Sequence, residues 1–460
     1  MAPFSKAATA LAALRADLVG DVFAPDDPGY DEARTIFNAM IDRHPAVIVQ
    51  CANAADVVRS VRFGRDLDLH IAVRGGGHGV AGMSLNDNGL VIDLRRMHEV
   101  TVHTGAETVR VEGGALMSHL DRATQPYGLA TTGGRSSATG VAGFVLGGGN
   151  GWLDRSFGPA VDNLLGVELV TADAGTVRAT DQENPELFWA LHGGGGNFGV
   201  ATALTLKLHP LPALSSALLT YRPETGPDAV RRYREIIAGG PPEVSGALMY
   251  TTGPPAECVP EHMVGKPLCV ALLTYLGGEE DLRELAQPLL ALPHETEILG
   301  AIRYVDLQRL LDDPPGLRNY RASEFLTGAP DDFVAAFCAL GEAVPVPTRT
   351  RHVLFPRGAA IASGPARFPV PHRDAPWCVH PCAIWEDPAD DERCIAWVQQ
   401  VRAGIRPWST GAIYLSFIGD EGGDRIVAGL GAESLRRLAA VKSVYDPDNV
   451  FRFNHNIRPT

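Results

Sequence analysis

Cysteine is scarce in this sequence, and its few copies form no pattern. The 460 residues include seven cysteines, an odd number, which are widely scattered and contain no Cys-x-x-Cys pair. A disulfide framework in a small secreted protein uses an even set of cysteines at regular spacings. The sequence therefore argues against disulfides and predicts reduced thiols in the core, at Cys51, Cys258, Cys269, Cys338, Cys378, Cys382 and Cys394.

Long apolar runs and an excess of positive charge are also absent. No stretch approaches the roughly 18 uninterrupted apolar residues of a membrane span. Arg15 and Asp17 interrupt the Ala-rich N-terminal run before a signal-peptide core could form, so we expect a cytoplasmic protein. Leu11, Leu14 and Leu18 instead share one helical face. With 54 Asp and Glu against 40 Lys and Arg, the charge of -14 repels nucleic acid and anionic membranes, and we expect neither as a partner.

Glycine and proline, by contrast, are abundant, with 50 Gly and 34 Pro. This composition is typical of many tight turns and short elements and disfavours a long helical bundle. From about Pro45 to Pro210, short Val/Ile-rich segments alternate with glycine clusters, which predicts strands closed by turns with helices between them. Residues 131–153 belong to this pattern, and we expect strand and turn there as well. The predicted fold class is α+β.

Composition divides the chain into three regions. Residues 1–210 carry the strand and glycine pattern, with its core at 40–210. In residues 211–405, Pro-rich joints separate helical runs, which marks a second domain. Residues 406–460 contain a helix that stops at Tyr445-Asp446-Pro447. Because this last region is too short to fold alone, we expect it to dock onto an earlier domain.

The loop Arg74-Gly75-Gly76-Gly77-His78-Gly79 follows a strand-like run and is the most informative segment. Consecutive glycines let the backbone approach a ligand closely and aim several N–H groups at an anion. Such a loop fits a dinucleotide pyrophosphate, and a histidine within it would lie beside the cofactor. A glycine-rich surface turn that happens to contain a histidine accounts for these six residues equally well.

A second cluster of glycine, serine and threonine occupies residues 132–153. Glycine weakens both helices and strands, so this composition does not serve core packing. It suits a wall around a flat, polar cofactor. A glycine-rich hinge between domains is the alternative.

These two clusters, followed by Asp162-Asn163, the segment 183–200 and the C-terminal Tyr445–Ile457, resemble the berberine-bridge-enzyme-like oxidases of the vanillyl-alcohol-oxidase superfamily. The similar segments cover about residues 35–210 and 370–460. The resemblance implies a PCMH-type FAD-binding domain of two subdomains, completed by the C-terminal region. It also implies an α+β substrate domain with an antiparallel sheet over the flavin.

The resemblance further implies that His78 bonds covalently to a methyl group of the flavin. Family members with two flavin links have a cysteine where Ser136 and Ser137 stand, so no cysteinyl link is expected. The residues expected to bind the cofactor are Arg74, Gly75, Gly76, Gly77, His78, Gly79, Gly133, Ser136, Ser137, Thr139, Gly140, Gly143, Gly147, Gly148, Gly149, Asn150, Gly151, Val200, Asn454 and Asn456.

The segment Gly194-x-Gly196-x-x-Gly199 matches the dinucleotide fingerprint of NAD-binding proteins. That fingerprint requires a following helix whose N-terminus faces the pyrophosphate. The residues that follow are β-branched and alternate in polarity, which predicts a strand. We therefore expect no NAD site, and the resemblance places this turn beside the flavin.

His380 stands where some family members carry a glutamate as catalytic base. A histidine suits this role, because its neutral form accepts a proton near pH 7. An ordinary pocket or core histidine is an equally good explanation. Other members use a tyrosine in a YxNY motif, but Phe417 occupies that place, which leaves Tyr414 and Tyr250 as further candidates.

Cys378, His380 and Cys382 alternate, which could suggest a metal. Three ligands along one face of an extended strand span too far for one ion, and no fourth partner is evident, so no metal is expected.

The resemblance implies an oxidase for a small organic substrate, an alcohol, sugar or secondary metabolite, acting by hydride transfer to flavin N5 with reoxidation by O2. A dehydrogenase or a natural-product tailoring oxygenase of the same fold remains an alternative, as does a flavin-binding protein without turnover. The gate near Ala142 and Phe144 would matter for oxygen access. The expected partners are a small molecule and O2, and the expected state is a monomer or homodimer.

Overall fold

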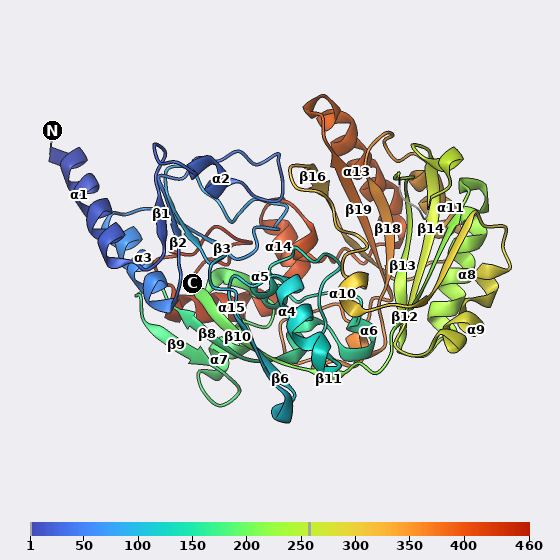
Figure 1. The fold of residues 1–460 in the computed structure, drawn as a ribbon, viewed down its shortest axis with the longest axis horizontal. Coiled ribbons are helices and arrows are strands. Elements are labelled where there is room, and N and C mark those ends of the chain that lie inside the picture. The colour runs from blue at the N-terminus through green and yellow to red at the C-terminus, as the bar shows by residue number, and fades with distance from the viewer. Residues whose placement is uncertain (1, 256–258) are drawn as a thin grey trace.

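The computed structural model describes residues 2–255 and 259–460 and shows two halves that meet face to face (Figure 1). Helices and largely antiparallel sheets confirm the α+β fold class. Six of the cysteines lie in the described part, where each is buried and unpaired, whereas Cys258 lies outside the described residues.

A four-stranded sheet in the first half carries the first glycine loop. Its strands have the order β1-β2-β4-β3, and both β2 and β3 run parallel to β4. Parallel strands are covered on both faces, and all four residues of β4 are buried accordingly. Leu11, Leu14 and Leu18 pack against this core. The elements are α1 (Ala2–Asp17), β1 (Asp21–Phe23), α2 (Tyr30–Arg34), β2 (Val47–Gln50), α3 (Ala54–Asp66), β3 (Ile71–Arg74) and β4 (Leu90–Asp93).

A five-stranded antiparallel sheet follows, in the order β5-β6-β10-β8-β9. The strands expected over residues 131–153 are absent, because the chain forms helix α5 there. Apolar residues at helical spacing in this stretch outweigh its glycines, and four of them are buried. The elements are β5 (Val100–His103), β6 (Thr108–Glu112), α4 (Met117–Thr124), β7 (Leu129–Ala130), α5 (Val141–Leu146), α6 (Asp154–Phe157), β8 (Leu164–Val170), β9 (Thr176–Ala179), α7 (Pro185–Ala190), β10 (Val200–Lys207) and β11 (His209–Pro210).

The second half is built on an eight-stranded antiparallel sheet with the order β15-β12-β14-β13-β18-β19-β16, in which β17 also pairs with β19. Helices cover one face, and the other face turns toward the first half (Figure 1). Every residue of β13 and β19 is therefore buried. The strands are β12 (Ser215–Tyr221), β13 (Val244–Thr252), β14 (Pro267–Tyr275), β15 (Thr296–Ala301), β16 (Arg318–Arg321), β17 (Glu324–Leu326), β18 (Arg351–Pro356) and β19 (Trp377–Trp385). The helices are α8 (Gly226–Gly239), α9 (Glu279–Leu290), α10 (Tyr304–Leu307), α11 (Asp331–Glu342), α12 (Ala360–Ser363) and α13 (Asp391–Ile405).

The chain then returns to the first half through α14 (Gly423–Leu430) and α15 (Ala432–Tyr445), drawn in red in Figure 1. Lys442 on α15 is fully buried and pairs with Asp446 at 2.6 Å. Its Nζ also donates to the carbonyl oxygens of Asn197 at 2.6 Å and Phe451 at 2.9 Å. This ammonium group joins the C-terminal residues to a third glycine-rich turn, residues 193–199.

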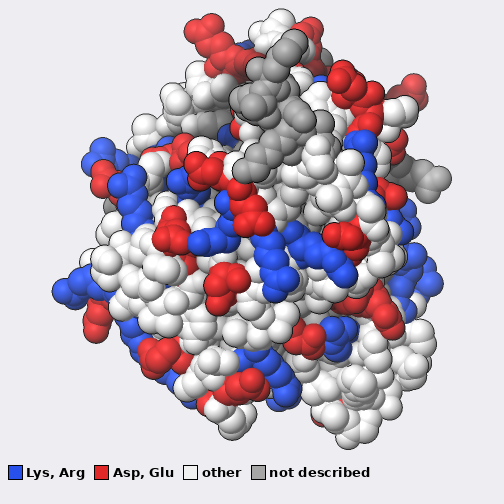
Figure 2. Space-filling model, turned by 90° about the vertical axis from the view of Figure 1, so that its left-hand side faces the viewer, with Lys and Arg blue, Asp and Glu red and all other residues white. Residues whose placement is uncertain are grey.

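Acidic and basic side chains are interspersed over the described part of the face shown in Figure 2. Among the described residues, no helix has the length and apolar character that crossing a membrane requires.

Candidate active site

A cavity of about 430 Å³ lies between the two halves. One wall, the backbone wall, is formed by residues 75–79, 134–150 and 193–199. The opposite wall, the sheet wall, is formed by side chains of β16, β18 and β19. Residues 414–418 and 451–455 also line the cavity, so the C-terminal region completes it.

The first two glycine segments touch each other backbone to backbone. A Cβ on Gly76 would lie 2.5 Å from the Gly140 nitrogen, and a Cβ on Gly140 would lie 2.4 Å from the Gly76 nitrogen. Real Cβ atoms do not approach so closely, so only glycine permits this crossing. At Gly79 and Gly143, in contrast, an added Cβ would meet no protein atom within 4 Å. Both of these residues line the cavity, and the missing side chains leave room for a ligand.

His78 lies in this crossing and stacks on Phe37, with ring centroids 3.9 Å apart. Burial, aided by the nearby guanidinium of Arg321, lowers the pKa of His78 to about 3. The imidazole is therefore neutral at physiological pH and has a free lone pair. A ring with that lone pair inside the cavity is chemically able to bond to an electrophilic carbon.

The residues expected at the cofactor divide into two groups. Those that line the cavity are Gly75, Gly76, Gly77, His78, Gly79, Ser136, Thr139, Gly140, Gly143, Gly147, Asn150 and Asn454. The others do not line it: Arg74, Gly133, Ser137, Gly148, Gly149, Gly151, Val200 and Asn456.

The residues in the second group shape or anchor the loops. Arg74 is buried and pairs with Asp93 at 2.7 Å, which fixes the start of the first loop. Gly151 packs against the Gly133 carbonyl so closely that a Cβ would lie 1.6 Å from its oxygen. Gly148 and Gly149 have φ values of 111° and 79°, which turn the chain where other residues would be strained.

Of the remaining three residues of that group, Ser137 and Val200 face protein. Ser137 donates from both its backbone N–H and its hydroxyl to the carboxylate of Asp312, at 2.8 and 2.6 Å. Val200 belongs to the apolar core beneath the first sheet. Asn456 lies beside the cavity-lining tail residues without lining the cavity itself.

The third glycine-rich turn, residues 193–199, lines the cavity but cannot act as a nicotinamide fingerprint. Strand β10 begins at Val200, directly after the turn. A strand has no helix N-terminus to face a pyrophosphate. The prediction of a strand in this place is confirmed.

His380 lies on β19 and lines the cavity in the middle of the sheet wall. Its Nδ1 is 2.6 Å from the carbonyl oxygen of Ala322, and its ring stacks on Phe417 at 3.8 Å. Burial, with the charge of Arg321 as a further cause, lowers the pKa of His380 well below its usual value. The neutral ring therefore donates from Nδ1–H to the carbonyl, which leaves Nε2 as the proton acceptor.

Tyr414 lines the cavity from the C-terminal region. Its hydroxyl oxygen accepts a hydrogen bond from the Gly149 N–H at 2.9 Å, and burial raises its pKa. Tyr250 does not lie with it: the side chain is fully buried on the helix-covered face of the sheet, where it packs against Phe337. This corrects the choice of Tyr250, since residues on a strand alternate between faces and its neighbour Met249 faces the first half.

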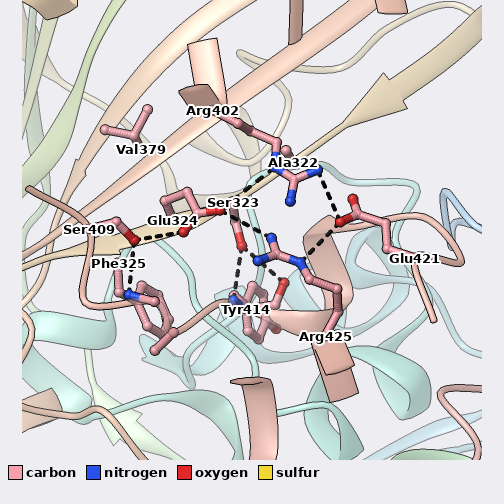
Figure 3. Close-up of polar contacts among 12 residues, drawn as sticks. Ala322, Ser323, Glu324, Phe325, Val379, Arg402, Ser409, Tyr414, Glu421 and Arg425 are labelled. Atoms are coloured by element: carbon pink, nitrogen blue, oxygen red, sulfur yellow. Dashed lines mark hydrogen bonds and ion pairs between the residues drawn. The ribbon is translucent and has the colours of Figure 1, made fainter. Parts of the chain in front are cut away.

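A buried polar network, the Glu324 clamp, holds the segment that carries Tyr414 (Figure 3). Glu324 accepts from Ser409 at 2.7 Å and from Arg425 at 3.1 Å, and Arg425 also donates to Glu421 at 3.0 Å. Arg402 completes the clamp by pairing with Glu421 at 3.2 Å. Ser323, the residue before Glu324, holds Tyr414 directly. Its hydroxyl accepts from the Tyr414 N–H at 2.9 Å and donates to the Tyr414 carbonyl at 3.2 Å.

Sequence reasoning missed the charged residues of the sheet wall. Arg321 and Arg351 lie on opposite sides of Cys382 in the strand register, and all three line the cavity. Arg351 pairs with Asp313 through two hydrogen bonds of 3.0 and 2.7 Å. Along their strands, these cavity-facing residues alternate with residues that point to the helix-covered face. This alternation identifies them as neighbours only when the register of the three strands is known.

Cys378, His380 and Cys382 share one face of β19, as their alternation predicted. Within residues 2–255 and 259–460, no group of three His, Cys, Asp or Glu is arranged to hold a metal ion.

Comparison with known families gives two matches. The family described as FAD binding domain matches residues 45–180, and the family described as berberine and berberine like matches residues 431–458. These ranges contain the first two glycine segments and the C-terminal tail. Both therefore fall on parts of the chain that line the cavity.

Similar proteins cover nearly the whole chain. The (R)-6-hydroxynicotine oxidase of Paenarthrobacter nicotinovorans is 30% identical over 99% of this chain and 99% of its own length. The crystal structure of 6-hydroxy-D-nicotine oxidase from Arthrobacter nicotinovorans is 27% identical, with a TM-score of 0.86 over 96% of this chain and 99% of that one. Glucooligosaccharide oxidase from Acremonium strictum, with a 6-S-cysteinyl, 8α-N1-histidyl FAD, shares the fold at 22% identity and a TM-score of 0.83, over 99% of each chain.

Proposed function

The chain belongs to the berberine-bridge-enzyme-like family of FAD-linked oxidases, and from this premise we propose that His78 holds FAD through a single covalent bond while His380 accepts a proton from the substrate. FAD-dependent oxidation of a small organic molecule is the activity of the family. The observation that carries the proposal is the placement of both neutral histidines on the lining of one cavity.

The residues present fit FAD. A glycine-rich loop such as residues 75–79 can hold a pyrophosphate through backbone N–H groups, without lysines. Gly79, Gly143, Gly195 and Gly196 all line the cavity, and a Cβ on any of them would meet no protein atom within 4 Å. The absent side chains thus leave space along the backbone wall for a flat, extended ligand.

We propose a single covalent link to the flavin, because the cysteine that would form the second link is absent. Ser136 and Ser137 stand at the place of the linking cysteine, and both hydroxyls donate to Asp312, at 2.8 and 2.6 Å. His78 is neutral and has a lone pair available for the bond. The glucooligosaccharide oxidase carries both links, so this chain would differ from it at the cysteinyl position.

When bound, FAD supplies the two-electron acceptor for the substrate C–H bond and passes the electrons to O2, which yields hydrogen peroxide. The protein contributes a base and its orientation. His380 is neutral, its tautomer is set by the Ala322 carbonyl, and its ring plane is set by the stack on Phe417. Its Nε2 is then free to remove the proton from a substrate alcohol or amine as oxidation proceeds.

The experiment that tests the tether is acid precipitation of the purified protein. With a histidyl bond, the yellow colour should remain in the pellet, because the bond survives unfolding. His78→Ala should retain FAD that is released completely into the supernatant, since the glycine loops still hold the pyrophosphate. Ser136→Ala is the matched control and should keep its colour in the pellet. Complete release from the wild-type protein would contradict the proposal.

Oxidase activity needs its own measurement. A screen of alcohols, oligosaccharides and phenols with peroxide detection should identify the substrate class, and stopped-flow reoxidation of the reduced protein in air should be rapid. The cavity-lining residues Ala142 and Phe144 provide positions at which to change oxygen access. Slow reoxidation in air would instead identify a dehydrogenase.

A further inference from the structure

Arg321 is a charged residue of the sheet wall that the proposed reaction does not use. It is the last residue of β16 and pairs in register with Cys382, two positions from His380 on β19. It lines the cavity, and its guanidinium carbon lies 5.1 Å from the centre of the Phe37 ring, which itself stacks on His78. Arg321 therefore lies close enough to act electrostatically on both histidines, on the wall that carries the base.

The charge of Arg321 has no counterion in the described part of the chain. Four Arg or Asp side chains line the cavity: Arg135, Asp313, Arg321 and Arg351. Arg351 pairs with Asp313 at 2.7 Å, and Arg135 lies 3.6 Å from the buried carboxylate of Asp154. Of these four, Arg321 alone is left without an acidic partner.

The hydrogen-bonding capacity of Arg321 is also largely unused. Its Nη2 donates to the side-chain oxygen of Asn319 at 2.8 Å. Its Nε is buried and has no acceptor among the described residues. Burying part of a cation that has free N–H donors costs free energy, unless an anion or several hydrogen-bond acceptors replace the lost water.

The groups that surround Arg321 supply no compensating charge. Phe37 presents a ring face, and His78 and His380 are neutral. The carboxylate of Asp312 is already held by three hydrogen bonds from Ser136 and Ser137.

We infer that Arg321 is a specificity-determining residue that binds a carboxylate on the substrate, so that the enzyme prefers an organic acid over its neutral analogue. A carboxylate accepts two parallel hydrogen bonds from a guanidinium, which provides orientation as well as charge. This inference rests on the proposed function, because it assumes that the substrate occupies the same cavity beside His380.

The test is a binding titration that requires no turnover. Benzoate and benzamide, which have the same shape but differ in charge, are titrated into the oxidised FAD-containing protein, and binding is followed by the change in flavin absorbance. The wild-type protein should bind benzoate about 10- to 100-fold more tightly, as expected for a charge-assisted hydrogen bond in a partly buried site. Arg321→Gln should reduce this ratio to about 1, and Arg321→Lys should retain part of it.

Arg318→Gln is the matched control. Arg318 lies on the same strand but pairs with Asp391 at 2.5 Å, and it does not line the cavity. Its replacement should leave the benzoate-to-benzamide ratio unchanged. Flavin content, read from the visible spectrum of each variant, verifies that the site is intact.

Equal affinities in the wild-type protein, no binding of either probe, or an unchanged ratio in Arg321→Gln would overturn the inference. If Arg321→Gln changed the flavin redox potential but left the benzoate-to-benzamide ratio unchanged, the charge of Arg321 would act on the cofactor and not on the substrate. Oxidation of a neutral substrate together with equal probe affinities would support the proposed function while refuting this inference. The failures of the two proposals are therefore distinguishable.

Discussion

The backbone wall and the sheet wall of the cavity are built by opposite means. In the backbone wall, glycines remove side chains, so that main-chain atoms meet each other and a ligand directly. In the sheet wall, alternate residues of three strands project Arg321, Arg351 and His380 toward the same space. The backbone wall is thus sensitive to any added atom, whereas the sheet wall is sensitive to the chemistry of single side chains.

The largest effect is expected where the backbone wall has no space. Gly76→Ala places a Cβ 2.5 Å from the Gly140 nitrogen, and neither backbone can move freely. We expect a loss of about 3 kcal/mol in the free energy of unfolding, together with loss of bound FAD. Urea unfolding and the ratio of flavin to protein absorbance measure the two effects.

Gly143→Ala is the control that distinguishes a clash within the protein from a loss of space for the ligand. Its Cβ would meet no protein atom within 4 Å, and alanine stabilises a helix interior by about 1 kcal/mol relative to glycine. The variant should fold at least as stably as the wild type, yet bind FAD less well. FAD content equal to that of the wild type in both glycine variants would contradict the proposed role of the backbone wall.

On the sheet wall, His380→Ala should slow flavin reduction by about 10²- to 10⁴-fold while leaving FAD content unchanged. The active form of the base is neutral, and burial lowers the pKa of His380 well below 6.5. Protonation then occurs only as the pH falls through this lowered pKa. Stopped-flow flavin reduction in the wild type should therefore remain constant as the pH falls through 6.5, and a rate within a few-fold of wild type in His380→Ala would refute the assignment.

A smaller effect, on stability, is expected in the Glu324 clamp. Glu324→Gln removes a charge that contacts two arginines and Ser409, at a residue that is only 7% exposed. We expect a decrease of about 2 kcal/mol in the free energy of unfolding, as for hydrogen bonds to charged groups. Thermal unfolding checks this value against Glu186→Gln at an exposed ion pair with Arg437, where a change under about 1 kcal/mol is expected.

The smallest effect is expected at Tyr250, behind the sheet wall. Tyr250→Phe should leave flavin reduction within a few-fold of wild type, because this side chain packs among the helices and does not line the cavity. A decrease of 100-fold or more in the rate of flavin reduction would mean that the two faces of the sheet are coupled.

The difference between the walls also explains what the sequence could reveal. Clusters such as residues 75–79 and 193–199 are visible because glycine itself marks close backbone approach. His380 was located through its place in a family motif, not through its own surroundings. Arg321 could not be found, because it lies 61 positions before Cys382 in the chain and becomes its neighbour only through strand pairing.

Two predictions are wrong, for different reasons. Residues 131–153 continue the pattern of short apolar segments and glycine clusters that predicts strands, although the apolar residues within α5 recur at helical spacing. Tyr250 is a candidate only as an aromatic residue of the second domain, and the sequence does not show which face of its strand it occupies; in the structure it faces the helices. The spacing of the apolar residues decides the first case, and the packing of helices on one face of the sheet decides the second.

The buried Lys442 also determines when during biosynthesis the cavity can be completed. Its ammonium group joins the Asn197 and Phe451 carbonyls, and the Ile457 N–H bonds to the Asn197 side chain at 2.9 Å. A ribosome must therefore synthesise residue 457 before the turn made at residues 193–199 acquires all its partners. The complete set of bonds that fixes this turn therefore forms only after residues of both halves have been synthesised.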